Sequence, residues 1–582
     1  MRDWNRVREK IRQGALKELW AEARWILRYI VRYRKAVVFY ICIGVAGALT
    51  GLLGSLTSKY AIDAVTGQQA ELLVWMVALF AVTGFGSIGL QAVMKRMLTR
   101  ISLKINREMM EEVYTRILST EWTAMNGYHS GDLLNRINID VRQVAGSVLG
   151  WVPSLIIQSV HFIGSLGIIL YYDPVMALLA LLSAPVTVLV SRVLLYKMRE
   201  YNKRMRQADS EMMGFTEESF QHIQSIKSLH LTDLFRNRLK KVQENYVGTS
   251  LEYNDFSVGT SAFLSSVSLV ISFLCMGWGV YRLWTGYITY GTMTLFLQLA
   301  RSLSGDFSSL IRLVPSAISA ATSAGRIMDV TELPREPEGD RENVREMARE
   351  AAEGIGITLQ GVNVSYEEGK SVLRDCELSV KPGETVALMG RSGSGKTTLL
   401  RLILGIVHSS SGTAVMYTRS GGRTEPLGAA TRELIAYVPQ GNTVFSGTIL
   451  ENLVMVAPEA SEEEAEEALK TACAWDFVKE LPDGIHSVVG EKGNGLSEGQ
   501  AQRISIARAV FKKAPVILFD EATSALDEET GRQVLCNIRR KMEHCTCIIV
   551  THRSSLLEAC TSVFRLENGK VIRAAEGQND EE

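Results

Sequence analysis

The sequence predicts a multidomain protein: an all-α polytopic membrane domain with six transmembrane helices, followed by an α/β domain that contains a phosphate-binding loop. The chain has 582 residues, more than a single hydrophobic core usually organises. Its long apolar segments lie in the first 320 positions. From about residue 355 onwards, strand-like runs alternate with helical patterns, as in α/β folds.

Charge and cysteine content narrow the functional classes. Lysine plus arginine and aspartate plus glutamate both total 63, so there is no basic excess and we expect no nucleic-acid partner. The eight cysteines are scattered without the spacing of a disulfide framework or a zinc site, which is consistent with a reducing compartment.

Residues 1–35 form the expected cytoplasmic N-terminus. They carry eleven lysines and arginines and no apolar run long enough for a signal peptide. Between Ala15 and Tyr33, apolar and charged residues mix in a pattern that predicts an amphipathic helix on the membrane surface, with its cations towards anionic headgroups. A soluble helix that binds a partner protein is the alternative.

Residues 36–330 constitute the predicted membrane domain. Each of its six apolar segments reaches the roughly 20 residues that a helix needs to span the hydrocarbon. The segments are residues 36–58, 71–94, 145–172, 174–196, 258–285 and 291–317. The second and fourth connections are long and basic, and the other three are short and nearly free of lysine and arginine. The positive-inside rule therefore places both termini, the long connections and the C-terminal half in the cytoplasm.

The two long connections are expected to be helical hairpins. Charged and apolar residues interleave along both, so the membrane helices should continue far into the cytoplasm and turn at polar breaks. One predicted break covers residues 122–132, and the other lies around residues 206–210. The tips could press on a soluble domain, or they could be solvated loops.

The sixth segment carries a polar stripe whose members recur at spacings of three and four, which places them on one helical face. The stripe consists of Gln298, Arg301, Ser302, Gly305, Ser309 and Arg312, with Asp306 at its edge. Ionisable groups at bilayer depth usually face a protein interior or a watery cavity, so we predict that the stripe lines a substrate path, and its arginines favour an anionic substrate. The alternative is that the arginines are solvated at the cytoplasmic end. His161 and Gln158 on the third segment are further candidates, although a hydrogen bond between membrane helices would explain them equally well.

A charged linker at residues 331–354 leads to the second domain, residues 355–576, and an acidic tail at 577–582. The apolar run 385–389 is followed by Gly-Arg-Ser-Gly-Ser-Gly-Lys-Thr-Thr and then by helix-forming residues, which is the context of a phosphate-binding loop. Glycines let successive N–H groups point inward at a helix N-terminus, so the loop holds phosphate oxygens. The predicted contacts are Gly390, Ser392, Gly393, Ser394, Gly395, Lys396, Thr397 and Thr398.

The chemistry of a nucleotide site with Mg²⁺ follows from these residue types. Lys396 would reach the β- and γ-phosphates, and the hydroxyl of Thr397 would hold Mg²⁺. A later apolar strand ends in Asp520 and Glu521. Asp520 can hold the water shell of the metal, and Glu521 can polarise an attacking water as a general base. Another apolar strand places His552 near the same end of the sheet.

A five-residue motif upstream of that carboxylate strand is the most specific mark of the chain: Leu496, Ser497, Glu498, Gly499 and Gln500. With it, nearly the whole chain resembles the ATP-binding cassette (ABC) transporters, specifically the exporter-type half-transporters. The resemblance implies that the motif is the signature that contacts ATP bound to a partner chain. Glu498 replaces the central glycine of the usual signature, and a carboxylate near a triphosphate would repel it unless the side chain points away.

The remaining motifs match the family in order. The resemblance implies that Tyr366 stacks on adenine, that Asp527 belongs to the D-loop, that Gln440 senses Mg²⁺ and the attacking water, and that His552 is the switch histidine. The implied catalytic residues are Lys396, Gln440, Glu521 and His552. The implied Mg²⁺ ligands are Thr397, Gln440 and Asp520. Residues 131–136, 218–223 and 490–493 also resemble exporter segments.

The resemblance implies an ATP-driven exporter, with ATP and Mg²⁺ as cofactors, for a hydrophobic, amphipathic or peptide-like cargo (a small molecule, lipid or peptide). One copy of each motif implies that the chain is half of a complete transporter, so we expect a homodimer or a heterodimer with another half-transporter. The alternatives are an importer on the same scaffold and an ATP-gated channel or sensor. Gating by ATP binding does not require fast hydrolysis, so it would not need the general base Glu521. The six spans argue against a soluble ATPase acting on DNA. A bacterial cytoplasmic membrane is the expected location.

Overall fold

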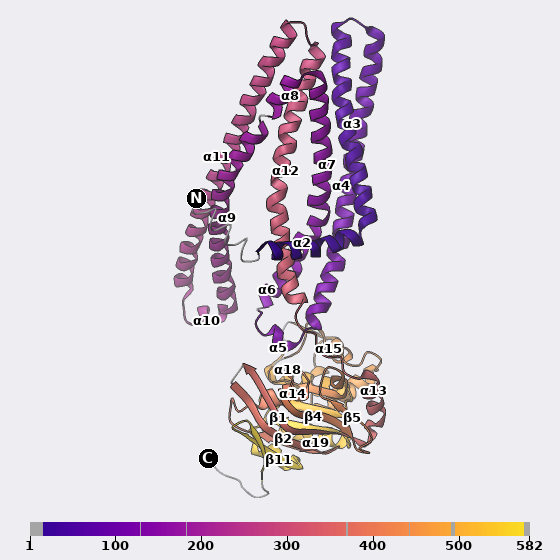
Figure 1. Ribbon diagram of the computed structural model, residues 1–582. Helices are drawn as coiled ribbons and strands as arrows, with labels where there is room; N and C mark the ends of the chain where they lie inside the picture. The colour runs from indigo at the N-terminus through magenta and orange to yellow at the C-terminus, as the bar shows by residue number, and fades with distance from the viewer. Residues whose placement is uncertain are drawn as a thin grey trace. The chain divides into compact units, whose positions relative to one another are not determined.

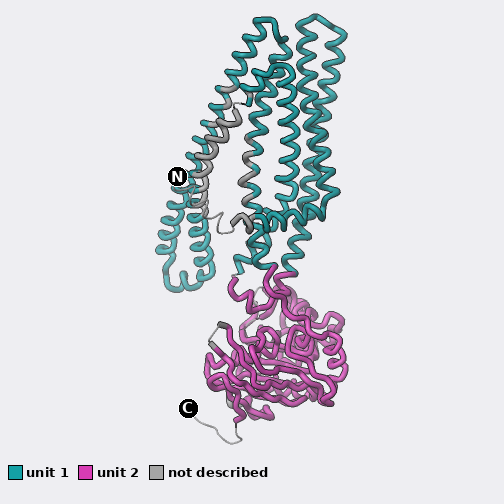
Figure 2. The backbone as a smooth tube through the Cα atoms, in the orientation of Figure 1, with its two compact units in different colours: residues 1–115, 130–331 teal, residues 116–129, 332–582 magenta. Residues whose placement is uncertain are grey.

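The computed structural model describes residues 15–128, 130–181, 183–367, 370–441, 443–490 and 495–574. The chain divides into two compact units (Figure 2). Unit 1 comprises residues 1–115 and 130–331, and unit 2 comprises residues 116–129 and 332–582. The tip of the hairpin between α4 and α7 thus belongs to the same unit as the phosphate-binding loop.

Unit 1 is built from helices (Figure 1). These are α2 (Ala15–Arg32), α3 (Arg34–Thr66), α4 (Ala70–Leu118), α6 (Ser130–Asn135), a π-helical turn (Arg136–Asp140), α7 (Val141–Tyr172), α8 (Pro174–Leu181), α9 (Ser183–Gln221), α10 (Ile223–Ser228), α11 (Thr232–Trp284) and α12 (Tyr290–Thr331). Among the described residues, four helices are long and apolar enough to cross a membrane: Arg34–Thr66, Ala70–Leu118, Ser130–Tyr172 and Thr232–Trp284. The expected segment 174–196 falls on α8 and α9, and segment 291–317 falls on α12.

The second hairpin turns later than predicted. Helix α9 runs through residues 206–210 to Gln221, so the predicted break there is wrong. That stretch contains no glycine or proline, and a short polar run does not end a helix that packs against a neighbour along its length. Helices α9 and α11 lie side by side, with the rings of Phe215 and Phe235 stacked 5.7 Å apart. The chain reverses at α10 instead.

The core of unit 1 forms around α12. Its side chains Leu295, Phe296, Leu299 and Leu303 are buried together with residues from α3, α7, α8 and α11. Glycine permits the close approach of α3 and α7, since a Cβ on Gly44 would lie 2.1 Å from Ile157 Cδ1. Small residues have this role where membrane helices pack.

Helix α2 buries one of its faces within unit 1. Ile26 and Tyr29 are buried, whereas Trp20 and Val31 are exposed. The hydroxyl of Tyr29 donates to Glu112 on α4 at 3.3 Å. The helix is therefore held by protein contacts on one side, and its exposed apolar residues are available for the predicted contact with the membrane surface.

Unit 2 contains two main sheets. The antiparallel sheet has the strand order β2-β1-β4-β5, with β1 (Ile355–Glu367), β2 (Lys370–Val380), β4 (Ser411–Thr418) and β5 (Thr424–Pro426). The second sheet has the order β12-β11-β3-β10-β9-β6, with β3 (Thr385–Met389), β6 (Ile435–Val438), β9 (Val516–Asp520), β10 (Thr546–Val550), β11 (Ser562–Glu567) and β12 (Lys570–Arg573). Its strands β11, β3, β10, β9 and β6 are parallel, so their carboxyl ends meet at one edge.

The helices of unit 2 are α5 (Trp122–Met125), α13 (Arg341–Glu350), α14 (Lys396–Ile403), α15 (Ile449–Val454), α16 (Glu462–Thr471), α17 (Trp475–Val478), α18 (Glu498–Phe511) and α19 (Glu528–Lys541). One apolar core joins the two sheets with α14, and another joins the parallel sheet with α15, α16, α18 and α19. Helix α13 lies in the predicted linker, where Asp340 caps it by accepting from the N–H groups of Glu342 and Asn343.

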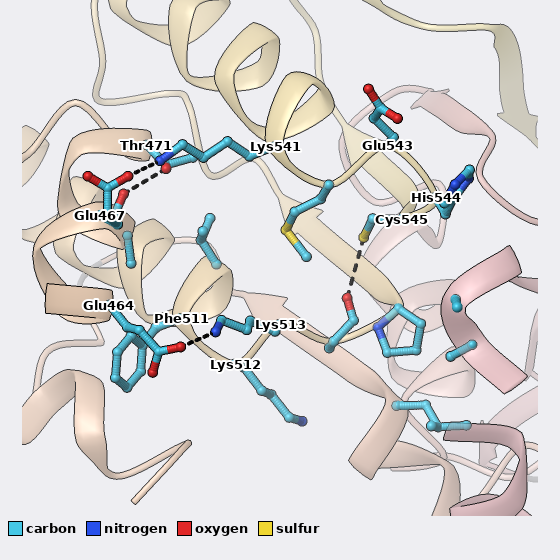
Figure 3. A pocket seen from close by; sticks show the side chains of 18 of the residues that line it. Glu464, Glu467, Thr471, Phe511, Lys512, Lys513, Lys541, Glu543, His544 and Cys545 are labelled. Carbon is cyan, nitrogen blue, oxygen red and sulfur yellow. Dashed lines mark hydrogen bonds and ion pairs between the residues drawn. The ribbon is translucent and has the colours of Figure 1, made fainter. Parts of the chain in front are cut away.

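A cavity of about 800 Å³ lies between α16, α18 and α19. It adjoins Pro515 and Cys545, which precede β9 and β10, so it is at the amino ends of the parallel strands. Figure 3 shows two ion pairs on its rim, Glu464 with Lys513 and Glu467 with Lys541. The phosphate-binding loop follows the carboxyl end of β3, at the opposite edge of the sheet.

Candidate nucleotide-binding site

The phosphate-binding loop joins the buried strand β3 to helix α14. Gly390, Gly393 and Gly395 have φ values of 155°, 79° and 110°, a region that residues with a Cβ rarely adopt. A Cβ on Gly390 would also lie 2.7 Å from the carbonyl oxygen of Leu566. The backbone can therefore curl tightly, and the first N–H groups of α14 lie at the loop, where the helix dipole favours an anion.

Two side chains of the loop fit a phosphate ligand. Within the described part of the chain, the buried hydroxyl oxygen of Ser394 has no hydrogen-bond partner, although buried polar atoms are nearly always paired. Lys396 is buried, and its Nζ donates to the carbonyl oxygens of Gly390 at 2.7 Å and Arg391 at 3.2 Å. A phosphate group would accept from both the hydroxyl and the ammonium.

The predicted Mg²⁺ ligands present one carboxylate, one hydroxyl and one amide. Asp520 ends β9 and is buried, and burial raises the pKa of its carboxyl group. It accepts hydrogen bonds from the hydroxyl of Tyr437 at 3.3 Å and from the hydroxyl of Thr397. Magnesium is usually bound by one or two protein carboxylates together with waters and substrate phosphates. The donor set around Asp520 therefore fits Mg²⁺ bound with a nucleotide, and the cation would offset the cost of the buried charge.

No cluster of three or more histidine, cysteine, aspartate or glutamate side chains that could hold a metal ion occurs among the residues that the structure describes. A metal site built from several such ligands, as in zinc proteins, is therefore not found in the described ranges.

The four predicted catalytic side chains meet at the carboxyl ends of β9 and β10. Gln440 Nε2 donates to Glu521 Oε2 at 2.8 Å. His552 Nε2 lies 3.3 Å from Glu521 Oε1 and 3.1 Å from Lys396 Nζ. Glu521 has a positive φ of 50°, which is unusual for a residue with a side chain, and its N–H donates to Val550 on the neighbouring strand at 3.2 Å. That strand therefore holds the backbone that directs Glu521 into the cluster.

Tyr366, the predicted adenine-stacking residue, is partly exposed on β1, and its hydroxyl lies 3.3 Å from Thr398 Oγ1. Sequence reasoning missed a neighbour of this ring, Arg401 on α14, whose Nη1 lies 3.5 Å from the Tyr366 hydroxyl. The Arg401 guanidinium also lies 4.7 Å from the ring centroid of Trp122. Arg401 was visible on the loop helix, but no local pattern could pair it with a tryptophan so distant in sequence.

The predicted signature begins helix α18. The hydroxyl of Ser497 accepts from the N–H of Gln500 at 3.2 Å, and Gln500 Oε1 accepts from the N–H of Ser497 at 2.8 Å. Leu496 packs against the apolar core, and Glu498 is exposed in the first helical turn. The exposed end of the signature is thus available to a partner. Residues 491–493 of the exporter-like loop lie outside the described residues.

The predicted D-loop packs against the signature. A Cβ on Gly499 would lie 2.9 Å from the carbonyl oxygen of Ala525. Asp527 caps α19 by accepting from the N–H of Thr530 at 2.9 Å, and this hydrogen bond lowers the pKa of Asp527. Arg553, next to His552, donates to the carbonyl oxygen of Leu526 at 2.7 Å. Direct contacts therefore connect the signature with the D-loop, and the D-loop with the His552 segment.

The substrate-path candidates separate into two groups. His161 Nδ1 lies 2.6 Å from Asp306 Oδ2, so the structure joins these two residues. Gln298 and Arg301 are exposed on α12. The side chain of Arg312 lies outside the described residues.

The chain is similar to known proteins over most of its length. Residues 37–307 match the family model of the ABC transporter transmembrane region, and residues 373–524 match that of the ABC transporter. An uncharacterised ABC transporter ATP-binding protein of Bacillus subtilis is 26% identical over 99% of this chain and 93% of its own length. A Staphylococcus aureus protein that carries the name of a multidrug export ATP-binding/permease protein is 29% identical over 94% and 95%. The structure of a bacterial Atm1-family ABC exporter with ATP bound has the same fold, with a TM-score of 0.78, 21% identity and coverage of 93% and 94%.

Proposed function

Since the chain belongs to the ABC transporters and joins their membrane region and their ATPase in one polypeptide, we propose that it uses ATP hydrolysis to export hydrophobic, amphipathic or peptide-like molecules. The single observation that carries the proposal is the cluster of Glu521, Gln440, His552 and Lys396. A site that only bound ATP would need the loop and Lys396 but not a carboxylate held beside a histidine. An importer is not favoured, because the relatives named for a direction are exporters.

The proposed roles follow from where the side chains lie. Lys396 and the N–H groups of α14 would hold the phosphates, and Asp520, Thr397 and Gln440 would hold Mg²⁺, which would neutralise charge on the phosphates. Glu521 accepts a hydrogen bond from the attacking water, and Gln440 keeps that carboxylate in place. His552 lies between Glu521 and Lys396, where it can orient the γ-phosphate.

The proposed working unit is a dimer, in which the exposed signature of each chain contacts ATP held by the loop of the other. The chain carries one loop and one signature, so two ATP sites require two chains. A homodimer and a heterodimer with another half-transporter both satisfy this requirement. In a homodimer Glu498 would stand in both signatures, whereas in a heterodimer this chain would supply Glu498 to one of them.

The chain is a multi-pass membrane protein. We propose the bacterial cytoplasmic membrane as its location, with both termini and the ATPase in the cytoplasm. The basic long connections support this orientation.

The test is ATP hydrolysis by the chain purified alone in lipid nanodiscs, with its mass measured in the same sample. Glu521→Gln should abolish steady turnover while ATP remains bound, and Glu377→Gln, an exposed glutamate on β2, is the matched control. Transport into inverted vesicles then gives the direction. Negligible turnover from a wild-type dimer would contradict a self-sufficient exporter and point to a second chain.

A further inference from the structure

A carboxylate and an imidazole meet inside unit 1, between helices α7 and α12. The side chains of His161 and Asp306, with Nδ1 and Oδ2 2.6 Å apart, are 22% and 17% exposed. His161 stands eleven residues before the end of α7 at Tyr172, a distance of about 16 Å along the helix axis and about half the thickness of the hydrocarbon. Ionisable groups at such depth are costly, and they mark sites that bind or move something polar.

Two buried polar side-chain atoms flank His161 on α7. Among the described residues, Gln158 Oε1 and the hydroxyl oxygen of Ser165 are buried without a hydrogen-bond partner, and Ser165 has no exposed surface. Gln158 stands three residues before His161 and Ser165 four after it, so the three side chains share one face of α7. Because buried polar atoms are nearly always paired, these two point to a partner that does not belong to the chain.

The ionised carboxylate of Asp306 and the amide oxygen of Gln158 only accept hydrogen bonds, and the hydroxyl of Ser165 can accept as well as donate. These groups are complementary to a ligand that donates N–H groups. The rings of Phe162 and Phe307 lie 6.4 Å apart next to the pair, and aromatic faces attract cations. A protonated amine attached to an apolar body matches both features.

Neither residues 36–58 of α3 nor Arg301 of α12 places a cation on the side of the helix that carries Asp306. Residues 36–58 of α3, a helix that packs against both α7 and α12, contain no charged residue. On α12, Arg301 is exposed five positions before Asp306, about 140° around the helix. Arg301 therefore belongs to another face, and the preference for an anionic substrate predicted from the arginines does not extend to this site.

We propose that Asp306, His161, Gln158 and Ser165 form a binding site for the protonated amine of an amphipathic molecule. This inference rests on the proposed export function and names the class of its substrate. Before the substrate binds, the imidazole of His161 occupies the carboxylate of Asp306. The ammonium replaces His161 at Asp306 and donates a further hydrogen to either Gln158 or Ser165, because these two residues stand about 10 Å apart along the helix axis and cannot share one ammonium. The apolar body lies against Phe162 and Phe307.

The experiment measures equilibrium binding to the full chain in nanodiscs, carrying Glu521→Gln so that hydrolysis does not interfere. The probes are 4-phenylbutylamine, 4-phenylbutanol and 4-phenylbutyrate, which share one apolar body and differ in charge, and empty nanodiscs correct for partition into lipid. The amine should bind at least about tenfold more tightly than the alcohol or the acid, which corresponds to about 1.4 kcal/mol. Asp306→Asn should reduce binding of the amine to the level of the alcohol.

The matched control is Asp255→Asn, which removes an exposed carboxylate from α11 and should leave the preference for the amine intact. Equal binding of the three probes, a preference for the acid, or amine binding that survives Asp306→Asn would each overturn the proposal. If the Asp306→Asn chain does not fold, the ranking of the three probes on the chain with Asp306 decides the question, and one of Gln158→Leu and Ser165→Ala should weaken binding of the amine alone.

Failure of this site and failure of the exporter proposal give different results. A chain that hydrolyses ATP and exports cargo but does not prefer the amine overturns only the site. A chain that prefers the amine but neither hydrolyses ATP nor moves cargo supports the site and overturns the exporter proposal.

Discussion

The guanidinium of Arg401 lies over the ring of Trp122, 4.7 Å from its centroid, and 3.5 Å from the hydroxyl of Tyr366. Trp122 stands at the tip of the hairpin between α4 and α7, and Arg401 stands on the helix that follows the phosphate-binding loop. The backbone of the tip also bonds to the predicted linker, since the N–H of Glu121 donates to the carbonyl oxygen of Pro334 at 3.0 Å. One arginine thus connects the hairpin tip with the ring expected to stack on adenine.

Arg401→Ala should raise the KM for ATP and leave kcat nearly unchanged. The substitution removes a cation–π contact of about 1 kcal/mol, which corresponds to about a fivefold change in an equilibrium constant. Arg401→Lys should recover only part of the loss, because an ammonium lacks the planar stacking face of a guanidinium. Steady-state ATPase kinetics in nanodiscs measure both constants. Arg419→Ala, an exposed arginine after β4, is the control, and an unchanged KM in Arg401→Ala would contradict the connection.

Glu498→Gln should increase ATP turnover at subsaturating ATP by a few-fold. Glu498 is exposed in the first turn of α18, where the proposed dimer brings it near the triphosphate held by the partner, and like charges repel. Added salt should shrink the gain, because exposed charges are screened over about 10 Å at 0.1 M. Glu462→Gln removes another first-turn glutamate, on α16, and should have no such effect. A turnover that falls in Glu498→Gln would show that the carboxylate assists the site.

The ion pair on the rim of the cavity in Figure 3 predicts a pH dependence. Hydrogen bonds from Lys541 and Lys470 lower the pKa of Glu467 below its ordinary value of 4.5. The pair therefore stabilises the fold above pH 4.5, and this contribution is lost as the pH falls through the lowered folded-state pKa. The difference in apparent unfolding temperature between wild type and Glu467→Gln should be largest near neutral pH and vanish in acid. A difference that grows in acid would contradict the assignment.

Asp173→Ala should strongly destabilise unit 1. Asp173 is 1% exposed and accepts from the N–H groups of Val175 and Met176, from Arg282 Nε at 2.8 Å and from Trp278 Nε1 at 3.3 Å. Removal of one partner from a buried ion pair costs about 3–5 kcal/mol, because the other charge is left uncompensated. Thermal unfolding in nanodiscs measures the loss. Asp255→Ala, at an exposed position, should have little effect, and Asp173→Asn should fall between the two because an amide oxygen still accepts.

The sequence alone predicted the nucleotide site and determined the helical character of the first part of the chain. A loop with glycines between an apolar strand and a helix can be recognised from local sequence. The residues that need positive φ and the helix that follows are neighbours in the chain. The same holds for Asp520 and Glu521, because parallel strands bring their carboxyl ends to one edge. Length and apolar composition identified membrane segments because the hydrocarbon imposes a minimum length on any single span.

The tertiary structure alone decided which distant side chains meet. Neither the pairing of His161 with Asp306 nor that of Arg401 with Trp122 has a local signature, because each depends on which face one helix presents to another element of the fold. The turn at α10, in place of a break near residues 206–210, has the same origin, since packing against α11 keeps α9 helical through a polar stretch. Local periodicity specifies elements and their faces, whereas the contacts between faces depend on the packing of the whole unit.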